Sequence, residues 1–318
     1  MICGHTNIYY IRGESQARIY SSLFEAQYLN VVFEELADLL CDDFSKYAFY
    51  VYSNSDPMYT LPLEAINDGR RKILIYLSDE ISSVPRHLGD SFLAVFKCYL
   101  RGDCFHRNIF PLALGYSKHI PERPVVSMEQ RGINVFFSGN LNTNRIKLYQ
   151  ELSGYSDYKF SPKEMDLLFQ LASLLPMDFS AHYPESYIKF TNGFGRGLSG
   201  EEYSRRLYQS KIAICPGGFV SNETFRHFEA MRAGCAIISA NLPDTFYYRG
   251  APIFTVSAWN EMDILVEWLL ADCKKLKEAQ MATRAWWDDV CSEKAMARYI
   301  FRTICDLNMS RAPGGAPG

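Results

Sequence analysis

The sequence predicts an α/β protein with two domains, each built on a parallel sheet. At 318 residues the chain is long enough for about two domains of ordinary size. Short runs of β-branched and aromatic residues alternate with stretches of helical periodicity, which is typical of parallel strands joined by crossover helices. After residue 116 the alternation is interrupted by a segment rich in charge and proline, and we place the domain boundary there.

The composition excludes several function classes. With 48% apolar and 22% charged residues, the chain is typical of a folded globular protein rather than a disordered one. Lys and Arg number 33 against 36 Asp and Glu, so no positive excess favours nucleic acid as a partner. No apolar run approaches the roughly 20 residues that cross a bilayer, and the N-terminus lacks the pattern of a leader peptide.

Nine cysteines are scattered along the chain without a Cys-x-x-Cys pair. An odd, dispersed set is typical of reduced thiols rather than of a disulfide framework or a zinc site. We therefore expect a cytoplasmic protein, and the sequence leaves open a peripheral contact with the inner face of the membrane.

The first domain is expected to span residues 1–117. Apolar residues recur every three or four positions between residues 16 and 40, which predicts a long helix. Runs rich in β-branched and aromatic residues then predict buried parallel strands at residues 47–52 and 72–77, with a third at 94–100.

A connection over residues 118–130 leads to the second domain, residues 131–309. A strand at 133–137, the pair Ser138-Gly139 and a helix over 144–152 form the opening of a Rossmann-like unit, with Asn142 or Thr143 as its helix cap. Further strands are expected at 187–190, 212–215, 236–239 and 253–256, with helices at 201–209, 223–233 and within 263–308. The Pro/Gly-rich tail, 310–318, is expected to be disordered.

The densest cluster of candidate binding residues lies between residues 215 and 235, where a strand end, a glycine turn and a helix follow one another. Gly217 and Gly218 permit a sharp turn and a close approach of the backbone to a ligand. Ser221 or Asn222 is expected to cap the helix, whose N-terminus suits a phosphate group. The other candidates in this cluster are Glu223, Thr224, Arg226 and Glu229.

Arg226 and Glu229 stand three residues apart and therefore share one face of this helix. The guanidinium suits phosphate oxygens, while the carboxylate suits the hydroxyl groups of a ribose. The alternative is that the two side chains pair with each other on a solvated face.

Gly139 begins a second group of candidates at the start of the helix over 144–152. Asn140, Asn142 and Arg145 follow it and are placed to reach phosphate groups. The chain contains no Asp-x-Asp, and its histidines have no partners at a recognisable metal-ligand spacing. We therefore expect no metal, so that arginines and a helix end must neutralise the charge of the ligand.

The segment 203–218, followed by Arg-His-Phe-Glu-Ala-Met-Arg-Ala-Gly-Cys at 226–235, resembles the donor half of exostosin-like glycosyltransferases, which have the two-domain GT-B architecture. In that broader superfamily a Glu followed by Ala-Met-Ala-x-Gly binds the donor ribose, and Glu229 occupies the matching position. A second Glu commonly lies eight residues earlier, where this chain has Ser221. This departure leaves open whether transfer inverts or retains the configuration of the sugar.

The first domain resembles bacterial exostosin-like proteins in three segments, 75–80, 95–99 and 108–116, with matching order and spacing. The resemblance spans about residues 70–260. It implies two Rossmann-like domains facing a central cleft, with a nucleotide-sugar as co-substrate and no cofactor. The implied activity is transfer of a sugar to a hydroxyl of a glycan, glycolipid or polysaccharide, as in polysaccharide biosynthesis.

Asp79 and Glu80 directly follow the predicted strand at 72–77, and ligands of open parallel sheets bind beyond the carboxyl ends of the strands. Inverting transfer needs one base to take the proton of the acceptor hydroxyl. Asp79 and Glu80 are therefore the candidate catalytic residues, and the alternative is that they cap the next helix and pair with Arg86. The reserve candidates in the N-terminal loop are His5 and Glu14.

Two other functions remain open. The segment 195–200 matches the Gly-x-Gly-x-x-Gly fingerprint of dinucleotide-binding proteins, which is the basis for an NAD-dependent oxidoreductase. Ser199-Gly-Glu-Glu202 is also a helix capping box, which explains the composition of this segment without any cofactor. A catalytically silent carbohydrate-binding protein of the same fold is the third possibility.

Overall fold

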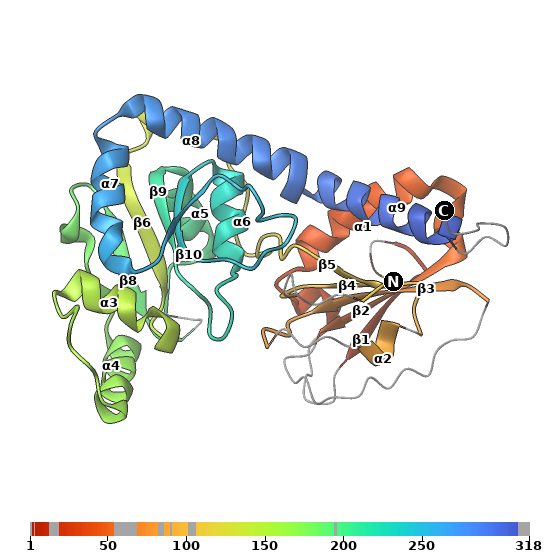
Figure 1. Cartoon of the computed structure of the whole chain (residues 1–318), viewed down its shortest axis with the longest axis horizontal. Coiled ribbons are helices and arrows are strands. Elements are labelled where there is room, and N and C mark those ends of the chain that lie inside the picture. Colours follow the sequence, from red (N-terminus) through yellow and green to blue (C-terminus); the bar gives the residue numbers. More distant parts are fainter. Residues whose placement is uncertain are drawn as a thin grey trace. The chain divides into compact units, whose positions relative to one another are not determined.

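The computed structural model describes residues 2, 4–12, 19–53, 69–81, 86–89, 91–100, 106–193 and 196–310. The chain divides into two compact units. Unit 1 comprises Met1–Lys118, Pro243–Arg249 and Asp288–Gly318, and unit 2 comprises His119–Leu242 and Gly250–Trp287. Each unit contains one sheet in which parallel strands predominate, so the predicted α/β fold class is confirmed (Figure 1).

Unit 1 has a five-stranded sheet of parallel strands in the order β1-β2-β3-β4-β5. The strands are β1 (Ile8–Arg12), β2 (Tyr47–Ser53), β3 (Arg71–Leu77), β4 (Ala94–Lys97) and β5 (Ile109–Pro111). The helices are α1 (Ala26–Leu40), α2 (Arg86–Gly89) and α9 (Glu293–Ser310). β2 and β3 are buried almost throughout, which is why their apolar runs could be recognised in the sequence.

Helices α1 and α9 lie side by side on one face of this sheet (Figure 1). Phe33 of α1 contacts Phe49 of β2 with ring centroids 5.7 Å apart, and Tyr299 of α9 contacts Phe96 of β4 at 5.9 Å. On the opposite face, Leu88 of α2 joins an apolar cluster of strand residues. The sheet of unit 1 therefore has helices on both faces.

Helix α9 belongs to unit 1, whereas the sequence predicted that residues 131–309 form a single second domain. The Tyr28 hydroxyl donates to the Cys291 carbonyl at 2.7 Å, and the Tyr116 hydroxyl donates to Glu293 Oε1 at 2.7 Å. Met296 and Ile304 of α9 are buried. Because periodicity reveals an apolar face but not its partner, the sequence could not assign this helix to unit 1. The predicted tail beyond Ser310 lies outside the described residues.

Unit 2 has a six-stranded sheet in the order β11-β10-β9-β6-β8-β7, in which only β7 runs antiparallel to its neighbour. Its strands are β6 (Ile133–Asn140), β7 (Met177–Asp178), β8 (Tyr187–Thr191), β9 (Ser210–Cys215), β10 (Ala236–Ala240) and β11 (Ile253–Val256). Its helices are α3 (Ile146–Ser153), α4 (Pro162–Leu174), α5 (Gly200–Tyr208), α6 (Phe225–Ala233), α7 (Met262–Leu270) and α8 (Cys273–Trp286). Unit 2 also has short 3-10 turns at Met128–Gln130, Thr143–Arg145, Ser180–His182 and Trp259–Glu261. Unit 1 has 3-10 turns at Tyr20–Ser22 and Cys41–Lys46, and a π-helical turn lies at Trp287–Cys291, where the chain passes from unit 2 to unit 1.

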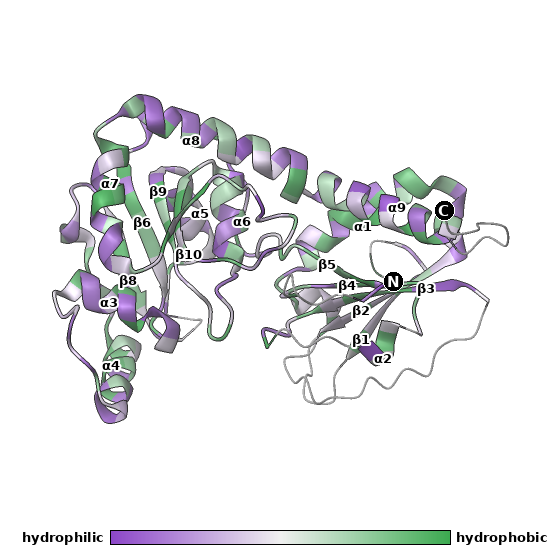
Figure 2. Ribbon diagram, in the orientation of Figure 1, coloured by the Kyte–Doolittle hydropathy of each residue, from purple (hydrophilic) through white to green (hydrophobic). Residues whose placement is uncertain are grey.

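The core of unit 2 lies between this sheet and its helices. α3, α7 and α8 bury apolar side chains against one face, where Val135, Phe137 and Ile214 belong to the same cluster. On the other face, Tyr203 of α5 contacts Phe136 of β6 edge to face, with ring centroids 5.2 Å apart. The strands carry mainly hydrophobic colours, whereas α8 alternates between hydrophilic and hydrophobic along its length (Figure 2).

The strand order of unit 2 contains a topological switch point. β6 is the first strand of the unit, the chain continues to β8 on one side of it, and then crosses to β9 on the other side. The segments that leave β6 and β9 at their carboxyl ends therefore diverge, and ligands of open α/β sheets bind in the crevice between such segments. The two groups of candidate residues in the second domain follow these two strands.

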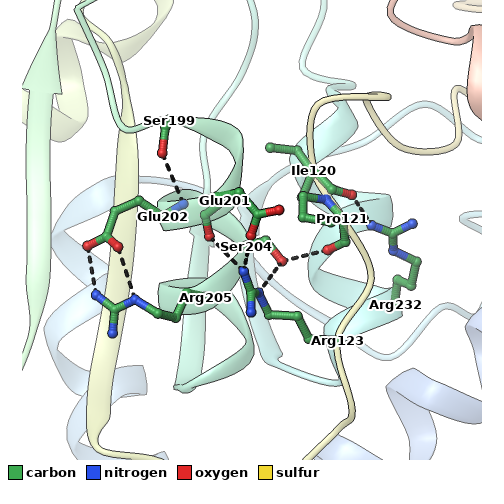
Figure 3. Close-up of polar contacts among 9 residues, drawn as sticks. All are labelled: Ile120, Pro121, Arg123, Ser199, Glu201, Glu202, Ser204, Arg205 and Arg232. Atoms are coloured by element: carbon green, nitrogen blue, oxygen red, sulfur yellow. Dashed lines mark hydrogen bonds and ion pairs between the residues drawn. The ribbon is translucent and has the colours of Figure 1, made fainter.

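The segment that enters unit 2 is fastened to α5 and α6 by side chains of both helices (Figure 3). Arg232 donates to the Ile120 carbonyl at 2.5 Å, and the Ser204 hydroxyl donates to the Pro121 carbonyl at 2.5 Å. Arg123 donates to the Ser204 hydroxyl at 3.1 Å and forms an ion pair with Glu201. These contacts bring the backbone of the segment directly against the start of α5.

Gly200→Ala is expected to destabilise unit 2. A Cβ at Gly200 would overlap the carbonyl oxygen of His119 and lie 2.7 Å from its carbonyl carbon, and a backbone group cannot turn aside as a side chain can. We expect the free energy of unfolding in urea to fall by about 1–3 kcal/mol. Gly197→Ala is the matched control, because its nearest neighbour outside the adjacent chain is Thr191 Oγ1 at 3.9 Å. Equal unfolding curves for the two variants would contradict this account.

This packing also explains the last glycine of the fingerprint at 195–200, whose first residue lies outside the described residues. The segment follows β8 rather than the strands at the switch point, where a dinucleotide fingerprint belongs. Ser199 caps α5, since its hydroxyl accepts from the Glu202 N–H at 3.2 Å. Glu202 does not complete the predicted capping box, because its carboxylate pairs with Arg205 and Arg206 instead.

Candidate functional site

The two loops at the switch point of unit 2 are tied together by side chains of the loop after β6. Asn144 Nδ2 donates to the Gly218 carbonyl at 3.1 Å. Arg145 Nε donates to the Gly217 carbonyl at 2.7 Å. The structure therefore brings together two groups of candidate residues that lie more than 70 positions apart in the sequence.

Two arginine side chains converge at this crevice, one from each loop. Arg145 is buried and donates through Nη1 to the Asn140 carbonyl at 2.7 Å. Arg226, from the first turn of α6, donates through Nη2 to the Ser138 carbonyl at 2.9 Å. Their guanidinium carbons lie 5.9 and 5.7 Å from the centroid of the Phe137 ring. Two positive charges thus share one aromatic ring.

Gly139 makes room for these arginines. A Cβ at this position would overlap Nη2 of Arg226, lie 3.0 Å from its Cζ and lie 3.1 Å from Nη1 of Arg145. The glycine is therefore required by the close approach of the two guanidinium groups. Among the described residues, no ion pair includes Arg226, whose hydrogen bonds go to the Ser138 carbonyl.

Asn142 adds an unsatisfied donor to the same place. Its Oδ1 accepts from the Arg145 N–H at 3.2 Å, so Asn142 caps the short turn at Thr143–Arg145. The predicted helix itself begins later, at Ile146, with Arg145 rather than Asn142 or Thr143 as its N-cap. The side chain is only 6% exposed, and its Nδ2 has no hydrogen-bond acceptor among the described residues. Buried amide donors are almost always paired, so this unpaired donor next to Arg145 is a feature that folding alone does not explain.

The cap of α6 differs from the prediction of Ser221 or Asn222. Thr224 is the N-cap and Phe225 is the first helical residue. The Thr224 side chain accepts from the N–H at the third helical position, and its own N–H donates to His227 Nδ1 at 3.2 Å. The capping box therefore uses a histidine where Glu or Gln is usual, which is why the sequence pattern did not reveal it.

Ser221 and its neighbours shape the loop before this helix instead. The Ser221 hydroxyl accepts from the Glu223 N–H at 3.1 Å, and the Gly218 N–H donates to the Ser221 carbonyl at 2.7 Å. A Cβ at Gly217 would lie 2.8 Å from Asn222 Oδ1, so the turn is tight at this position. Glu223 is only 1% exposed. Gly217, Gly218, Ser221 and Glu223 thus lie in one compact turn at the crevice.

His227 is a buried structural histidine, and both of its ring nitrogens have partners. Nδ1 lies 3.2 Å from the Thr224 N and 3.1 Å from the Thr224 carbonyl oxygen, and Nε2 lies 2.8 Å from the Ser239 hydroxyl. Burial lowers the pKa of His227 from 6.5 to about 4. The imidazole is therefore neutral at pH 7 and offers no charge to a ligand.

We expect this histidine to make the protein sensitive to acid. Between pH 6.5 and 4 the unfolded chain binds a proton at His227 that the folded chain does not, so stability falls as the pH is lowered through this window. The shift corresponds to about 3 kcal/mol by pH 4. Urea unfolding of the wild type and of His227→Gln at pH 7, 5.5 and 4.5 measures the effect. An equal loss of stability in both proteins would show that other groups cause it.

Glu229 is buried and does not form the solvated pair with Arg226 that the sequence left open. It is 4% exposed, and its charge lies near the Tyr203 hydroxyl of α5. Burial raises the pKa of Tyr203 well above its ordinary value, and the charge of Glu229 raises it further. Tyr203 therefore remains a protonated donor. The sequence comparison included Tyr203 in the segment 203–218 but gave no signal of this contact.

A narrow void lies between α5 and the ends of β6 and β9. Phe137, Tyr203, Cys215 and Arg226 are among the residues that line it, and it has no room for a water molecule. Burial raises the pKa of the Cys215 thiol, so this cysteine is an apolar wall rather than a nucleophile.

In unit 1, Asp79 and Glu80 follow the end of β3 as predicted, but their environments differ. Asp79 is fully buried and forms an ion pair with Lys97 Nζ at 3.1 Å, rather than with Arg86. Glu80 is partly exposed. The sequence missed Lys97, which lies in the strand β4 and would have been noticed only as an isolated charge in a buried run. Of the reserve candidates, His5 packs against Phe44 with ring centroids 4.9 Å apart. Glu14 lies outside the described residues.

The described residues provide no cluster of three His, Cys, Asp or Glu side chains that could hold a metal ion. Seven cysteines in this part of the chain form no disulfide bond. No helix of the described segments is long and apolar enough to span a membrane.

No protein-family model matches the chain, and no curated protein sequence matches it. Among solved structures, TarM is 12% identical with a TM-score of 0.46 over 86% of this chain and 57% of its own. A glycosyltransferase from Rickettsia africae is 10% identical, with a TM-score of 0.46, over 93% of this chain and 84% of its own. Sucrose-phosphate synthase from Thermosynechococcus elongatus is 10% identical, with a TM-score of 0.45, over 94% and 82%.

Proposed function

We propose that the chain is a glycosyltransferase that uses a nucleotide-sugar donor. The observation that carries the proposal is the convergence of Arg145, Arg226 and the orphaned amide of Asn142 at the switch point of unit 2. Two guanidinium groups and a free amide donor match the oxygens of a diphosphate. The proposal agrees with the exostosin-like sequence resemblance, and the distant structural similarities are not needed for it.

In this proposal, unit 2 binds the donor. Arg226 and Arg145 contact the diphosphate, and the turn over 217–218 lets the backbone approach it. As the bond between sugar and diphosphate breaks, negative charge accumulates on the leaving group, and the fixed guanidinium groups stabilise it without reorganising. Glu229, next to Tyr203, receives the ribose hydroxyls. This arrangement neutralises the diphosphate without a metal ion.

Unit 1 supplies the base and binds the acceptor in this proposal. Glu80 is the better of the two predicted candidates, because the Asp79 carboxylate is buried and engaged by Lys97. A carboxylate at the carboxyl end of a parallel strand takes the proton of the acceptor hydroxyl as the bond to the sugar forms. We infer inverting transfer to a glycan, glycolipid or polysaccharide in the cytoplasm, with a peripheral membrane contact where the acceptor is a lipid.

The experiment that tests the proposal is a thermal-shift panel of UDP, GDP, CMP, dTDP and NAD. A ligand that binds only the folded protein raises Tm by mass action. We expect one nucleoside diphosphate or CMP to raise Tm in the wild type and not in Arg226→Gln. Transfer from the corresponding nucleotide-sugar to carbohydrate acceptors then establishes the reaction. A shift with NAD alone would favour the oxidoreductase, and nucleotide binding without transfer would favour a silent binding protein.

A further inference from the structure

A fully buried ion pair joins the carboxyl ends of β3 and β4 in unit 1. Asp79 Oδ2 and Lys97 Nζ are 3.1 Å apart, and both side chains are 0% exposed. Lys97 also donates to the carbonyls of Asp79 at 3.3 Å and of Cys98 at 3.0 Å. Its ammonium group lies 5.0 Å from the centroid of the Tyr76 ring. The lysine is thus surrounded by partners from the ends of both strands.

The turn after β3 is held in an unusual conformation around this pair. Ser78 has φ +67°, in the left-handed region that non-glycine residues rarely adopt. Its hydroxyl lies 2.9 Å from that of Ser53 at the end of β2. Asp79 Oδ1 accepts from the Ile81 N–H at 3.2 Å and so bridges Glu80. After β4, Tyr99 is also left-handed, with φ +57°.

Such an arrangement is not explained by stability. The desolvation of two buried charges offsets most of their attraction, so a buried ion pair contributes little to folding compared with apolar residues of the same size. Left-handed backbone at a serine and a tyrosine adds strain, and strained residues concentrate at functional sites. The residue between Asp79 and the Ile81 N–H is Glu80, which is partly exposed.

We propose that Lys97 and Asp79 are positioning residues that fix the turn over residues 78–81 and thereby hold the Glu80 carboxylate in one orientation. The role of Glu80 as the base rests on the proposed function, whereas the effect of the ion pair on the turn does not. The two parts of the proposal therefore need separate measurements: amide exchange for the turn, and kcat for its effect on Glu80.

The test removes the ion pair without leaving a lone buried charge. In Asp79→Leu/Lys97→Met both charges are replaced by apolar side chains of similar size, which buried sites commonly tolerate. We expect a Tm close to that of the wild type and unchanged exchange in the strand 71–77. The Ile81 amide is expected to exchange at least 10-fold faster. Transfer is expected to lose at least 10-fold in kcat, with the KM of the donor unchanged.

Ser78→Gly is the second variant, because glycine adopts a positive φ without strain and leaves the ion pair in place. It is expected to loosen the same turn and to lower kcat less than the double variant does. Unchanged Ile81 exchange in the folded double variant would overturn the proposal. If the double variant does not fold, unchanged Ile81 exchange and unchanged kcat in Asp79→Asn would overturn it, because asparagine keeps the Oδ1 that accepts from the Ile81 N–H and removes the charge that pairs with Lys97. If the wild type transfers no sugar, the proposed function fails, while the exchange result still decides whether the pair fixes the turn.

Discussion

Replacing Glu80 by glutamine is expected to lower kcat by about 10²–10⁴-fold, the usual contribution of a general base. Glutamine keeps the shape of the side chain but cannot take a proton from the acceptor hydroxyl. The affinity for the nucleotide is expected to stay unchanged, because the candidate donor residues belong to unit 2. Initial rates at saturating donor and isothermal titration with the free nucleotide measure the two quantities separately.

The matched control for this variant is Glu34→Gln, which removes an exposed carboxylate from α1 of the same unit. It is expected to keep the kcat of the wild type. Near-native kcat in Glu80→Gln would show that another group is the base, whereas a lower nucleotide affinity with intact kcat would mean that Glu80 binds the donor. Either result would remove Glu80 from the role assigned above.

Arg226→Gln is expected to weaken the binding of the free nucleotide by about 10–100-fold. This range corresponds to about 1.5–3 kcal/mol, the contribution of a hydrogen bond to a charged group. Glutamine retains a donor but loses the charge, so the attraction to a diphosphate decreases most. Titration at low and high salt provides a second check, because the difference between the proteins should shrink as salt screens the charge.

Gly139→Ala tests the role of the Arg226 guanidinium by displacing it instead of removing it. The added methyl would overlap the Arg226 guanidinium, which can swing aside because it is the end of a flexible side chain. We therefore expect weaker nucleotide binding with little loss of stability, in contrast to Gly200→Ala. The matched control for Arg226→Gln is Arg205→Gln, which removes the charge of an arginine of α5 whose side chain is 56% exposed. Equal affinities in Arg226→Gln and Arg205→Gln would contradict a diphosphate site at this crevice.

Most strands were predictable because they are continuous apolar runs, and β2, β3, β9 and β10 are nearly fully buried. The strands β1, β5 and β7 were not predicted. Helix ends were harder to place. Helix α6 begins after Thr224 because His227 completes its cap, and α1 begins at Ala26, ten positions after the start of the predicted helix. Caps depend on one or two hydrogen bonds, which apolar periodicity does not report.

Most residues of the candidate site could be predicted from the sequence, but the contacts between them could not. Glycine turns and polar side chains after apolar runs mark strand ends, which is how Gly217, Arg226 and Glu80 were found. The contact of Arg226 with Ser138 joins positions separated by 88 residues, and that of Lys97 with Asp79 spans 18. Tyr203 and Lys97 were missed as site residues because a tyrosine in a helix and a lysine in a strand carry no signal of their own.

The sequence by itself determined the fold class, the position of most strands and the residues that end them, because these follow from local composition and from burial along the chain. Only the tertiary structure decided that α9 packs on α1, that two arginines meet at Gly139, and that Asp79 is engaged by Lys97 while Glu80 is not enclosed with it. The physical reason is that buried positions require apolar residues, which can be recognised in the sequence. Which residues contact one another depends instead on how distant segments pack in the tertiary structure.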